Sequence, residues 1–435
     1  MNIDLTSKAI LKRIVSHTLL LLSFTLSAQN IVLDDDEKDA SGRKLLLPYA
    51  FYTESLEFTV GVLGGTSGYL QPQTSFVASV FTTSNDSNAL FLSLRDYQLP
   101  FAKRVFIEFI GSYAYYTDQR VYTGFNADFP GEHGGSNDSS DENFLRGSGD
   151  DQWYDLKFKY LLPIGYGENK IINTFRLKHG LLVDGQTGGD VWNPMISGRT
   201  NFELSVFSRH RTILEESGEN VGNSEGVTAS LEYDNRDFYV NPTKGSLQKI
   251  TMKHDFGVLE GSDNWSVIQL DLRKYLYLGT SDKFRQSVLA LDYWTSYTPS
   301  WNPSVDNLGP YIDGRPPNSL GSTLGGFFRL RAYPVDRFSD KAAIYYSAEL
   351  RLMPRWHPLG NMKVLKPLNI DWWQIVPFVE IGRVAPQWSF SDLHTDMRKV
   401  LGVGLRFMAQ KAVFRLDTSF SNDSWAMYAM VGQPF

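Results

Sequence analysis

The 435-residue sequence contains no cysteine, and its charges are nearly balanced. The lack of cysteine excludes disulfide scaffolds, cysteine-based zinc sites, thiol catalysis and a lipid-modified cysteine anchor. A formal net charge of −6 argues against nucleic acid as a partner, because phosphate binding requires a basic surface. Beyond the N-terminal region, no charge-free apolar run reaches the roughly 20 residues of a transmembrane helix. No metal and no cofactor are predicted.

Aromatic residues, by contrast, make up 14% of the chain, and 42% of all residues are hydrophobic. A disordered chain has far fewer of both. This composition favours a β-protein in which polar and apolar residues alternate.

The N-terminal region, residues 1–28, resembles a secretory signal peptide. Lys8, Lys12 and Arg13 form its basic part, an apolar core follows, and Ser27-Ala28 offers a cleavage site. An N-terminal anchor helix is the alternative, but the apolar core is short for a bilayer span. Residues 29–55, which include an acidic run, are predicted to form a short periplasmic leader.

Segments in which apolar and polar residues alternate recur through the rest of the chain. Alternation with a period of two is the mark of a strand with one apolar and one polar face. Sixteen segments are predicted as strands: 56–63, 75–83, 88–96, 104–116, 153–162, 171–183, 200–208, 226–236, 246–256, 266–277, 285–297, 342–353, 374–384, 399–408, 412–420 and 425–435.

Two architectures share this pattern, a soluble β-sandwich and a membrane β-barrel. Strands near ten residues, tyrosine and tryptophan at strand ends, and a signal peptide favour the barrel. The prediction is an all-β fold, a closed antiparallel transmembrane β-barrel of 16 strands over residues 56–435. One difficulty is that the long connections 117–152 and 354–373 then fall on the periplasmic side, where turns should be short. An element before residue 210 is therefore split or missed.

Two connections have distinctive compositions. The segment 126–151 is rich in Gly, Ser, Asn and Asp; an acidic surface loop is favoured over a calcium site, because the carboxylate spacing fits no EF-hand. The segment 298–334 is rich in proline and glycine but also holds two arginines among aromatic residues. It is too long for a structureless turn.

Three motifs stand out in the second half of the chain. They are Leu330-Arg331-Ala332-Tyr333; Phe378-Val379-Glu380-Ile381-Gly382; and Asp234-Asn235-Arg236-Asp237 followed by Pro242 and Gly245. Together, and in their order along the chain (234–245, then 330–333, then 378–382), they resemble motifs of the BamA/TamA barrel superfamily, the bacterial surface antigen domain that two-partner secretion transporters share. The resemblance covers residues 200–435 best.

This resemblance implies that segment 298–334 is the sixth external loop, which folds back into the barrel lumen. The family's loop arginine, here Arg331, meets an acid of the thirteenth strand, here Glu380. Ala332 stands where the family has glycine, so a backbone with positive φ would cost energy there.

The residues themselves support this pairing. Phe378, Glu380 and Gly382 share one strand face, and an acid facing lipid is costly, so Glu380 is predicted to face the lumen. A bidentate contact with Arg331 is expected to contribute about 1–3 kcal/mol. For Asp234, Arg236 and Asp237 two interpretations are open: a second lumen network, or charges at a strand end beside a Pro-Gly turn.

The two ends of the chain add two expectations. Family members that move proteins carry periplasmic POTRA modules, but residues 29–55 give only 55 − 29 + 1 = 27 positions, below the roughly 50 of a small domain. A separate periplasmic partner protein would then supply such modules. Phe435, on a last strand expected to face outward, resembles the C-terminal signal that the barrel-assembly machinery reads in its clients.

The predicted function is that of a BamA/TamA-type barrel in the outer membrane of a Gram-negative bacterium. It would assemble or translocate outer-membrane proteins or lipids, contact outer-membrane lipid and lipopolysaccharide, and have its lumen plugged by loop 298–334. The alternative is a passive channel or structural barrel.

An enzyme such as a phospholipase would need a serine–histidine pair. No enzyme is predicted, because no serine motif lies near the six histidines after the signal, His133, His179, His210, His254, His357 and His394.

Overall fold

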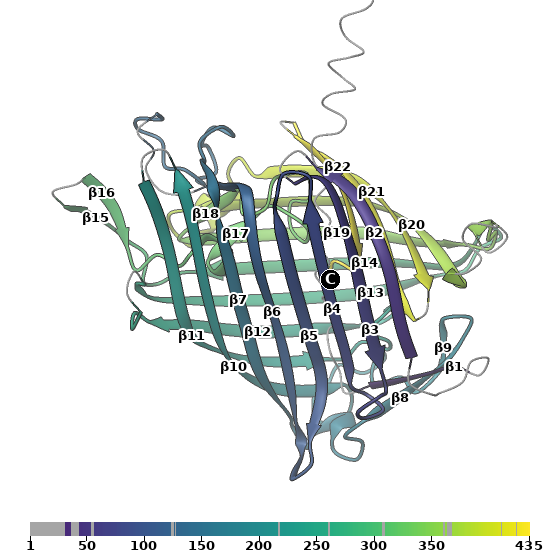
Figure 1. Ribbon diagram of the computed structural model, residues 1–435. Helices are drawn as coiled ribbons and strands as arrows, with labels where there is room; N and C mark the ends of the chain where they lie inside the picture. Colours follow the sequence, from purple (N-terminus) through teal and green to yellow (C-terminus); the bar gives the residue numbers. More distant parts are fainter. Residues whose placement is uncertain are drawn as a thin grey trace, which may run out of the picture.

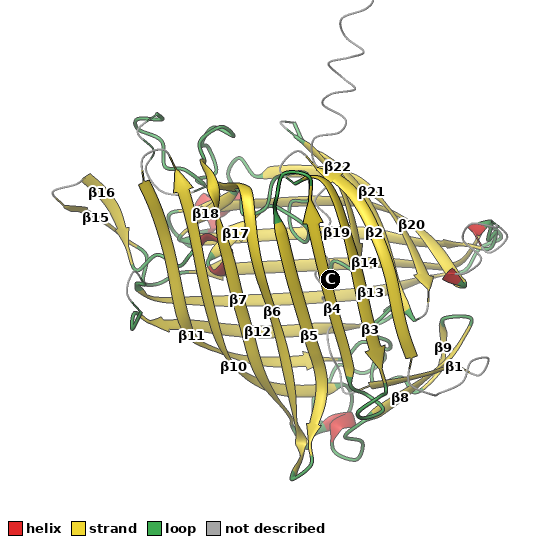
Figure 2. Ribbon diagram, in the orientation of Figure 1, coloured by secondary structure: helices red, strands yellow, loops and turns green. Residues whose placement is uncertain are grey.

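A sixteen-stranded antiparallel sheet dominates the structure, a computed structural model that describes residues 31–35, 43–53, 56–122, 126, 128–215, 218–259, 262–306, 309–359, 362, 368–409, 411–422 and 424–435. The predicted signal peptide lies outside the described residues. No described helix has the length and apolar character needed to cross a membrane. The sheet curves round on itself, with steep strands at the front of Figure 1 and nearly horizontal strands behind, and helices are few and short (Figure 2).

The strands follow one another in chain order, each antiparallel to the next. They are β2 (Arg43–Thr53), β3 (Glu57–Ser67), β4 (Ser75–Thr83), β5 (Asn88–Leu99), β6 (Ala102–Val121), β7 (Leu145–Leu161), β10 (Arg199–Glu215), β11 (Gly218–Asp234), β12 (Gly245–Phe256), β13 (Asn264–Gly279), β14 (Phe284–Tyr297), β19 (Ala342–Pro354), β20 (Ile370–Ala385), β21 (Arg398–Ala409), β22 (Ala412–Phe420) and β23 (Trp425–Val431).

The two faces of this sheet have opposite chemistry. Large apolar side chains cover the outer face; on β3, for example, Phe58, Val60 and Val62 are 55%, 45% and 42% exposed. Charged side chains such as Glu349 and Arg351 on β19 are completely buried on the inner face. A soluble sandwich has the reverse arrangement, so this pattern is the one expected of a membrane barrel.

The number of strands matches the prediction, but two elements differ. The sheet begins with β2, inside the 29–55 range assigned to a leader. Its three consecutive leucines hide the alternation, and Pro48 is tolerated because β2 is an edge strand. The predicted strand 171–183 is instead β8 (Asn173–Lys178) and β9 (Leu181–Asp184), which form a separate sheet with β1 (Ile31–Asp35). The alternation of β8 is real, but alternation does not specify a pairing partner.

The corrected order moves one of the two misplaced long connections to the expected end of the barrel. With β2 as the first strand, the connection 122–144 between β6 and β7 lies at the same end of the barrel as 298–341 between β14 and β19. The connection between β19 and β20 remains long at the opposite end, where the connection 162–198 between β7 and β10 also lies. We call residues 298–341 the inward loop; it contains β15 (Asn302–Asp306), β16 (Gly309–Asp313), η2 (Asn318–Leu320), β17 (Ser322–Leu324) and β18 (Phe338–Asp340).

The first and last strands meet by overlapping. Among the described residues, no backbone ladder joins β2 to β23. Instead, side chains from the outer face of the last strands and the inner face of the first strands form one apolar cluster: Ala412, Phe414 and Val431 with Tyr49, Leu63, Val77 and Phe91. The C-terminal edge therefore lies inside the N-terminal edge, where Figure 1 draws the first and last strands side by side.

The acidic connection between β6 and β7 packs on the inward loop. The Ser339 backbone N–H donates to the Gly135 carbonyl oxygen at 2.7 Å, and the Arg337 guanidinium donates to the Ser139 hydroxyl at 3.1 Å. These contacts make the connection a cover over the inward loop. Among the described residues, no group of three or more histidine, aspartate or glutamate side chains is placed to hold a metal ion.

Candidate functional site

The tip of the inward loop carries Arg331 into the barrel interior, against the inner faces of β19, β20 and β22. Its side chain is completely buried, and three carboxylates on three different strands accept its hydrogen bonds. Nε donates to Glu380 on β20 at 2.7 Å, Nη1 to Asp417 on β22 at 2.6 Å, and Nη2 to Glu349 on β19 at 2.9 Å. The Arg331 backbone N–H also donates to Glu380 at 2.7 Å, and the guanidinium lies 3.6 Å from the centre of the Phe378 ring.

Strand alternation explains why these acids converge. Phe378, Glu380 and Gly382 point inward while Pro377 and Val379 are exposed outside, as the sequence predicts. The contact between Arg331 and Glu380 is present, but it is one part of a larger network.

Glu349 and Asp417 were not predicted as partners of Arg331. Both acids also bind other arginines, which lie on the inner faces of the same or neighbouring strands. Glu349 accepts from Arg406 at 2.7 Å and from Arg351 at 2.9 Å, and Asp417 accepts from Arg415 at 2.8 Å. The signal that points to them is their place on the polar faces of β19 and β22, close to the strand that carries Glu380.

The backbone of the loop tip differs from the expectation at one residue. The left-handed conformation falls on Leu330, with φ of 51°, and not on Ala332. The replacement of the family's glycine by Ala332 therefore causes no such strain. Leu330 and Ala332 are buried, and Tyr333 packs edge-on against Phe338 with the ring centres 5.0 Å apart.

The inward loop also grips the last strand. The Ser424 hydroxyl donates to the Ala332 carbonyl oxygen at 2.7 Å, and Tyr428 of β23 donates to the Tyr333 carbonyl oxygen at 3.3 Å. The rings of Phe327 and Tyr428 lie 4.9 Å apart. The inward loop is thus attached directly to the last strand, which is one of the two edges that meet where the sheet overlaps.

The prediction that Phe435 ends an outward-facing strand is wrong. β23 ends at Val431, and Gly432, with φ of 94°, turns the chain inward. Phe435 is buried in a cluster with inner-face residues of β13 and β14, and its carbonyl oxygen accepts from Arg351 at 3.1 Å. Figure 1 marks the C-terminus within the barrel outline.

The third motif divides between the two interpretations. Asp234 and Arg236 form a buried ion pair at 2.5 Å, which fits an internal network. Asp237 shapes the turn instead, because its carboxylate accepts from the Thr243 backbone N–H at 2.9 Å. Burial raises the pKa of Asp237, while the hydrogen bonds from the turn oppose that rise. Pro242 is buried in this turn. Gly245 has φ of 91°, and a Cβ there would lie 2.0 Å from the Asn235 carbonyl oxygen.

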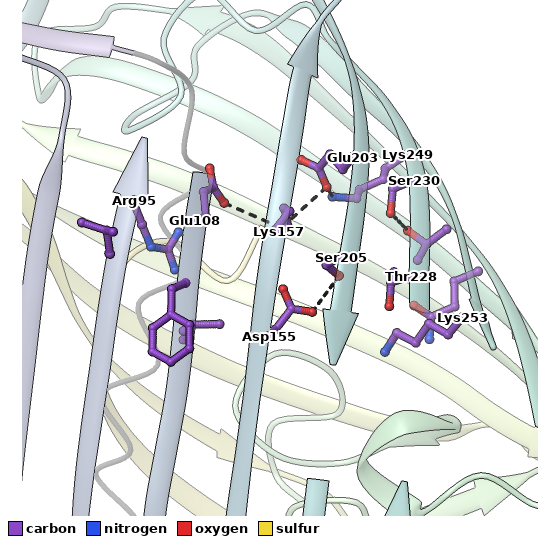
Figure 3. Close-up of a pocket in the computed structure, with 15 residues that line it drawn as sticks. Arg95, Glu108, Asp155, Lys157, Glu203, Ser205, Thr228, Ser230, Lys249 and Lys253 are labelled. Carbon is purple, nitrogen blue, oxygen red and sulfur yellow. Dashed lines mark hydrogen bonds and ion pairs between the residues drawn. The ribbon is translucent and has the colours of Figure 1, made fainter. Parts of the chain in front are cut away.

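Two polar cavities line the interior wall of the barrel on β5 to β13. They have volumes of about 410 and 390 Å³, and both are lined by Glu108, Lys157, Glu203 and Lys249. Lys157 lies between Glu108 and Glu203, at 3.8 and 3.6 Å, as Figure 3 shows. The second cavity also contacts Phe328 of the inward loop and the C-terminal residues 432–435.

A serine–histidine pair lies on the outer face. His254 on β12 and Ser266 on β13 are neighbours in the register, and the imidazole Nδ1 is 2.9 Å from the serine hydroxyl. Twelve residues separate them in the sequence, so no motif reveals the pair. A hydrolase would need an acid or amide on the other imidazole nitrogen, and no such contact is recorded for His254 in the described part of the chain.

Comparisons with known proteins identify the family. No curated protein sequence matches this chain. Solved structures that resemble it include CdiB from Acinetobacter baumannii (12% identity, TM-score 0.49) and CdiB from Escherichia coli (9% identity, TM-score 0.49). Each comparison covers 89% of this chain, which spans 58% and 61% of the two CdiB chains respectively.

The model of the Omp85 superfamily domain matches residues 72–424. This match confirms the predicted superfamily. Omp85 proteins are barrels of the bacterial outer membrane and are generally transporters or assembly factors, not enzymes. The chain, a sixteen-stranded sheet with an arginine-tipped inward loop, therefore belongs to the Omp85 superfamily.

Proposed function

We propose that this chain is a gated barrel of BamA/TamA type, which assembles or translocates outer-membrane proteins or lipids. The observation that carries the proposal is the complete burial of Arg331 against three carboxylates. Burying charges is costly, and such a network often stabilises less than apolar packing of the same volume. A passive pore has no need of such a costly network. A loop that must close the lumen in one defined position and also be released benefits from it.

The contacts of the plug suggest how opening would proceed. Ser424 and Tyr428, which bind the inward loop, lie at the last strand, and that strand meets β2 without a backbone ladder among the described residues. Release of the loop would remove contacts from the inner face of β23. In this scheme the seam then opens sideways and lets a substrate pass between lumen and membrane.

The partners follow from this scheme. Outer-membrane lipid and lipopolysaccharide would surround the outer face, a periplasmic protein would supply the POTRA function, and the barrel-assembly machinery would insert the chain as a client after export through a signal peptide. The internal position of Phe435 means that a client signal, if the last strand carries one, is exposed before the tail folds inward.

The passive channel is the second candidate, and the two polar cavities beside the plug favour it. The experiment compares the host bacterium with a strain that lacks the protein. We expect loss of other outer-membrane barrel proteins or of surface lipopolysaccharide, with unchanged uptake of a small hydrophilic solute. If solute uptake alone falls, the passive channel is correct and the proposal is wrong.

An Arg331→Ala variant extends the test. It removes the side chain that holds the plug and leaves the strands intact, so heat-induced unfolding on gels serves as the folding control. We expect faster proteolysis of the inward loop and impaired complementation. If the variant has a released loop but complements as well as the wild type, the inward loop is not needed for the function and the proposal is wrong.

A further inference from the structure

A groove of about 700 Å³ crosses the outer face of the barrel on β12, β13, β14, β19 and β20. Its walls are apolar side chains that project from four neighbouring strands. They are Leu272, Leu291, Tyr293, Ala348, Val379 and Ile381. Ala348 is the smallest of them and pairs with Leu291 on one side and Val379 on the other, so the floor of the groove lies at this alanine.

The groove is inclined to the ends of the barrel. The strand register places Val379, Ala348, Leu291, Lys274 and Ser246 in one row. Val379 is the tenth residue of β20, whereas Ser246 is only the second of β12, and both strands start at the same end. Four strand spacings of about 4.8 Å make the row roughly 19 Å long. It therefore rises from the barrel rim to the middle of the apolar band.

Polar groups gather at the rim end of the groove. Lys274 interrupts the outer face of β13, where Ile268, Leu270, Leu272 and Leu276 are otherwise apolar. Ser246 is only 3% exposed, and its hydroxyl oxygen has no hydrogen-bond partner among the residues that the structure describes, although the residue lines the groove.

An aromatic residue stands beside these groups. The Trp192 indole donates to the Gln248 side-chain oxygen at 3.1 Å. Tryptophan at this level is typical of the boundary between hydrocarbon and headgroups. The groove thus has an apolar part at membrane depth and a polar part at the interface.

We propose that this groove binds one phospholipid of the adjacent leaflet, with an acyl chain along the Ala348 floor and the phosphate against Lys274 and Ser246. A lysine on the lipid-facing side is destabilising unless an anion or water compensates it. A buried hydroxyl without a partner requires an acceptor, and phosphate oxygens accept from both hydroxyl and ammonium groups. A phospholipid supplies the apolar and the anionic parts together.

A second copy of the chain fits less well, because two such faces would bring two Lys274 side chains into apolar surroundings. The inference rests on the outer-membrane location of the family and on no transport activity. The purified full-length protein in detergent is therefore sufficient to test it.

The probe is phosphatidylglycerol with a photoactivatable diazirine in its acyl chain, compared with the same probe as diacylglycerol, which lacks the phosphate. Labelled peptides are mapped by mass spectrometry. Ala348→Trp fills the groove, and Ala78→Trp, on the outer face of β4 in the opposite wall, is its matched control. Lys274→Leu removes the charge, and Lys44→Leu, an exposed lysine on β2, is the control for charge.

We expect labelling concentrated on β14 and β19, abolished by Ala348→Trp and unchanged by Ala78→Trp. Lys274→Leu should lower labelling by phosphatidylglycerol about fivefold, the effect of one interfacial lysine on an anionic lipid, and leave the diacylglycerol label unchanged. Uniform labelling around the apolar band, equal loss in both alanine variants, or protein–protein crosslinks through the groove would each overturn the proposal.

Discussion

Replacing Arg331 by methionine should release the inward loop by a calculable amount. Glu349 and Asp417 each retain another arginine, but Glu380 makes its only ion pair within the described residues to Arg331. The variant therefore leaves one buried carboxylate without a cation. Breaking a buried pair in this way costs about 3–5 kcal/mol. At about 1.4 kcal/mol for each factor of ten, the released state should become about 10² to 10⁴ times more populated.

Single-channel recording in planar bilayers measures this population as the fraction of time that the lumen is open. Arg329→Met is the matched control, because Arg329 is partly exposed and its carboxylate contact, to Asp271, is long at 4.0 Å. Because this contact is long and is not a hydrogen bond, its loss should change the open fraction less than about tenfold.

The single variant Glu380→Gln and the double variant Arg331→Met with Glu380→Gln complete a double-mutant cycle. Removing both partners leaves no unpaired charge, so the double variant should be closed more often than Arg331→Met alone. The reasoning is refuted if the single variant opens no more than Arg329→Met, or if the effects of the two substitutions add without coupling.

Three further predictions concern the turn, the loops and the seam. Gly245→Ala should destabilise the barrel by more than about 1 kcal/mol, because φ is positive there, and heat-induced unfolding on gels measures this. Burial and a nearby arginine lower the pKa of His133 from 6.5 to about 4. The folded loops therefore favour the neutral imidazole, and they lose stability as pH falls from 6.5 to about 4. Burial raises the pKa of Asp340 to about 6, so this group stabilises the loop as pH falls from 6 towards its ordinary value. After correction for the intrinsic pH dependence of amide exchange, acidification should therefore raise the protection of the inward loop relative to wild type in His133→Gln and lower it relative to wild type in Asp340→Asn. Thiol crosslinking of Leu63→Cys with Val431→Cys, in a chain that has no other cysteine, should block function while each single variant stays active.

The sequence predicts the faces of the strands well, because each side chain's direction follows from local alternation. It fails for β2, where Leu45, Leu46 and Leu47 interrupt the alternation, and for β8, where alternation is present but the partner is β1. Pairing depends on which segments are already neighbours in space, and a local pattern does not contain that information.

The site was predictable only in part for the same reason. The motifs relate Arg331 to Glu380, yet the depth at which the loop enters decides that Glu349 and Asp417 also reach the guanidinium. The inward path of Phe435 includes a left-handed turn at Gly432, which the order of apolar residues in the last strand does not reveal.

The overlapped edges have a consequence for size. A cylinder closed by a continuous ladder has a circumference fixed by its strand number and stagger, and changing it means breaking backbone hydrogen bonds in a row. In this protein, apolar contacts of Val431 and Phe414 with Leu63 and Tyr49 hold the first and last edges of the sheet together instead. Such contacts have no preferred direction. The two overlapping edges of the sheet can therefore slide past each other, and the barrel can become narrower or wider without breaking a backbone hydrogen bond.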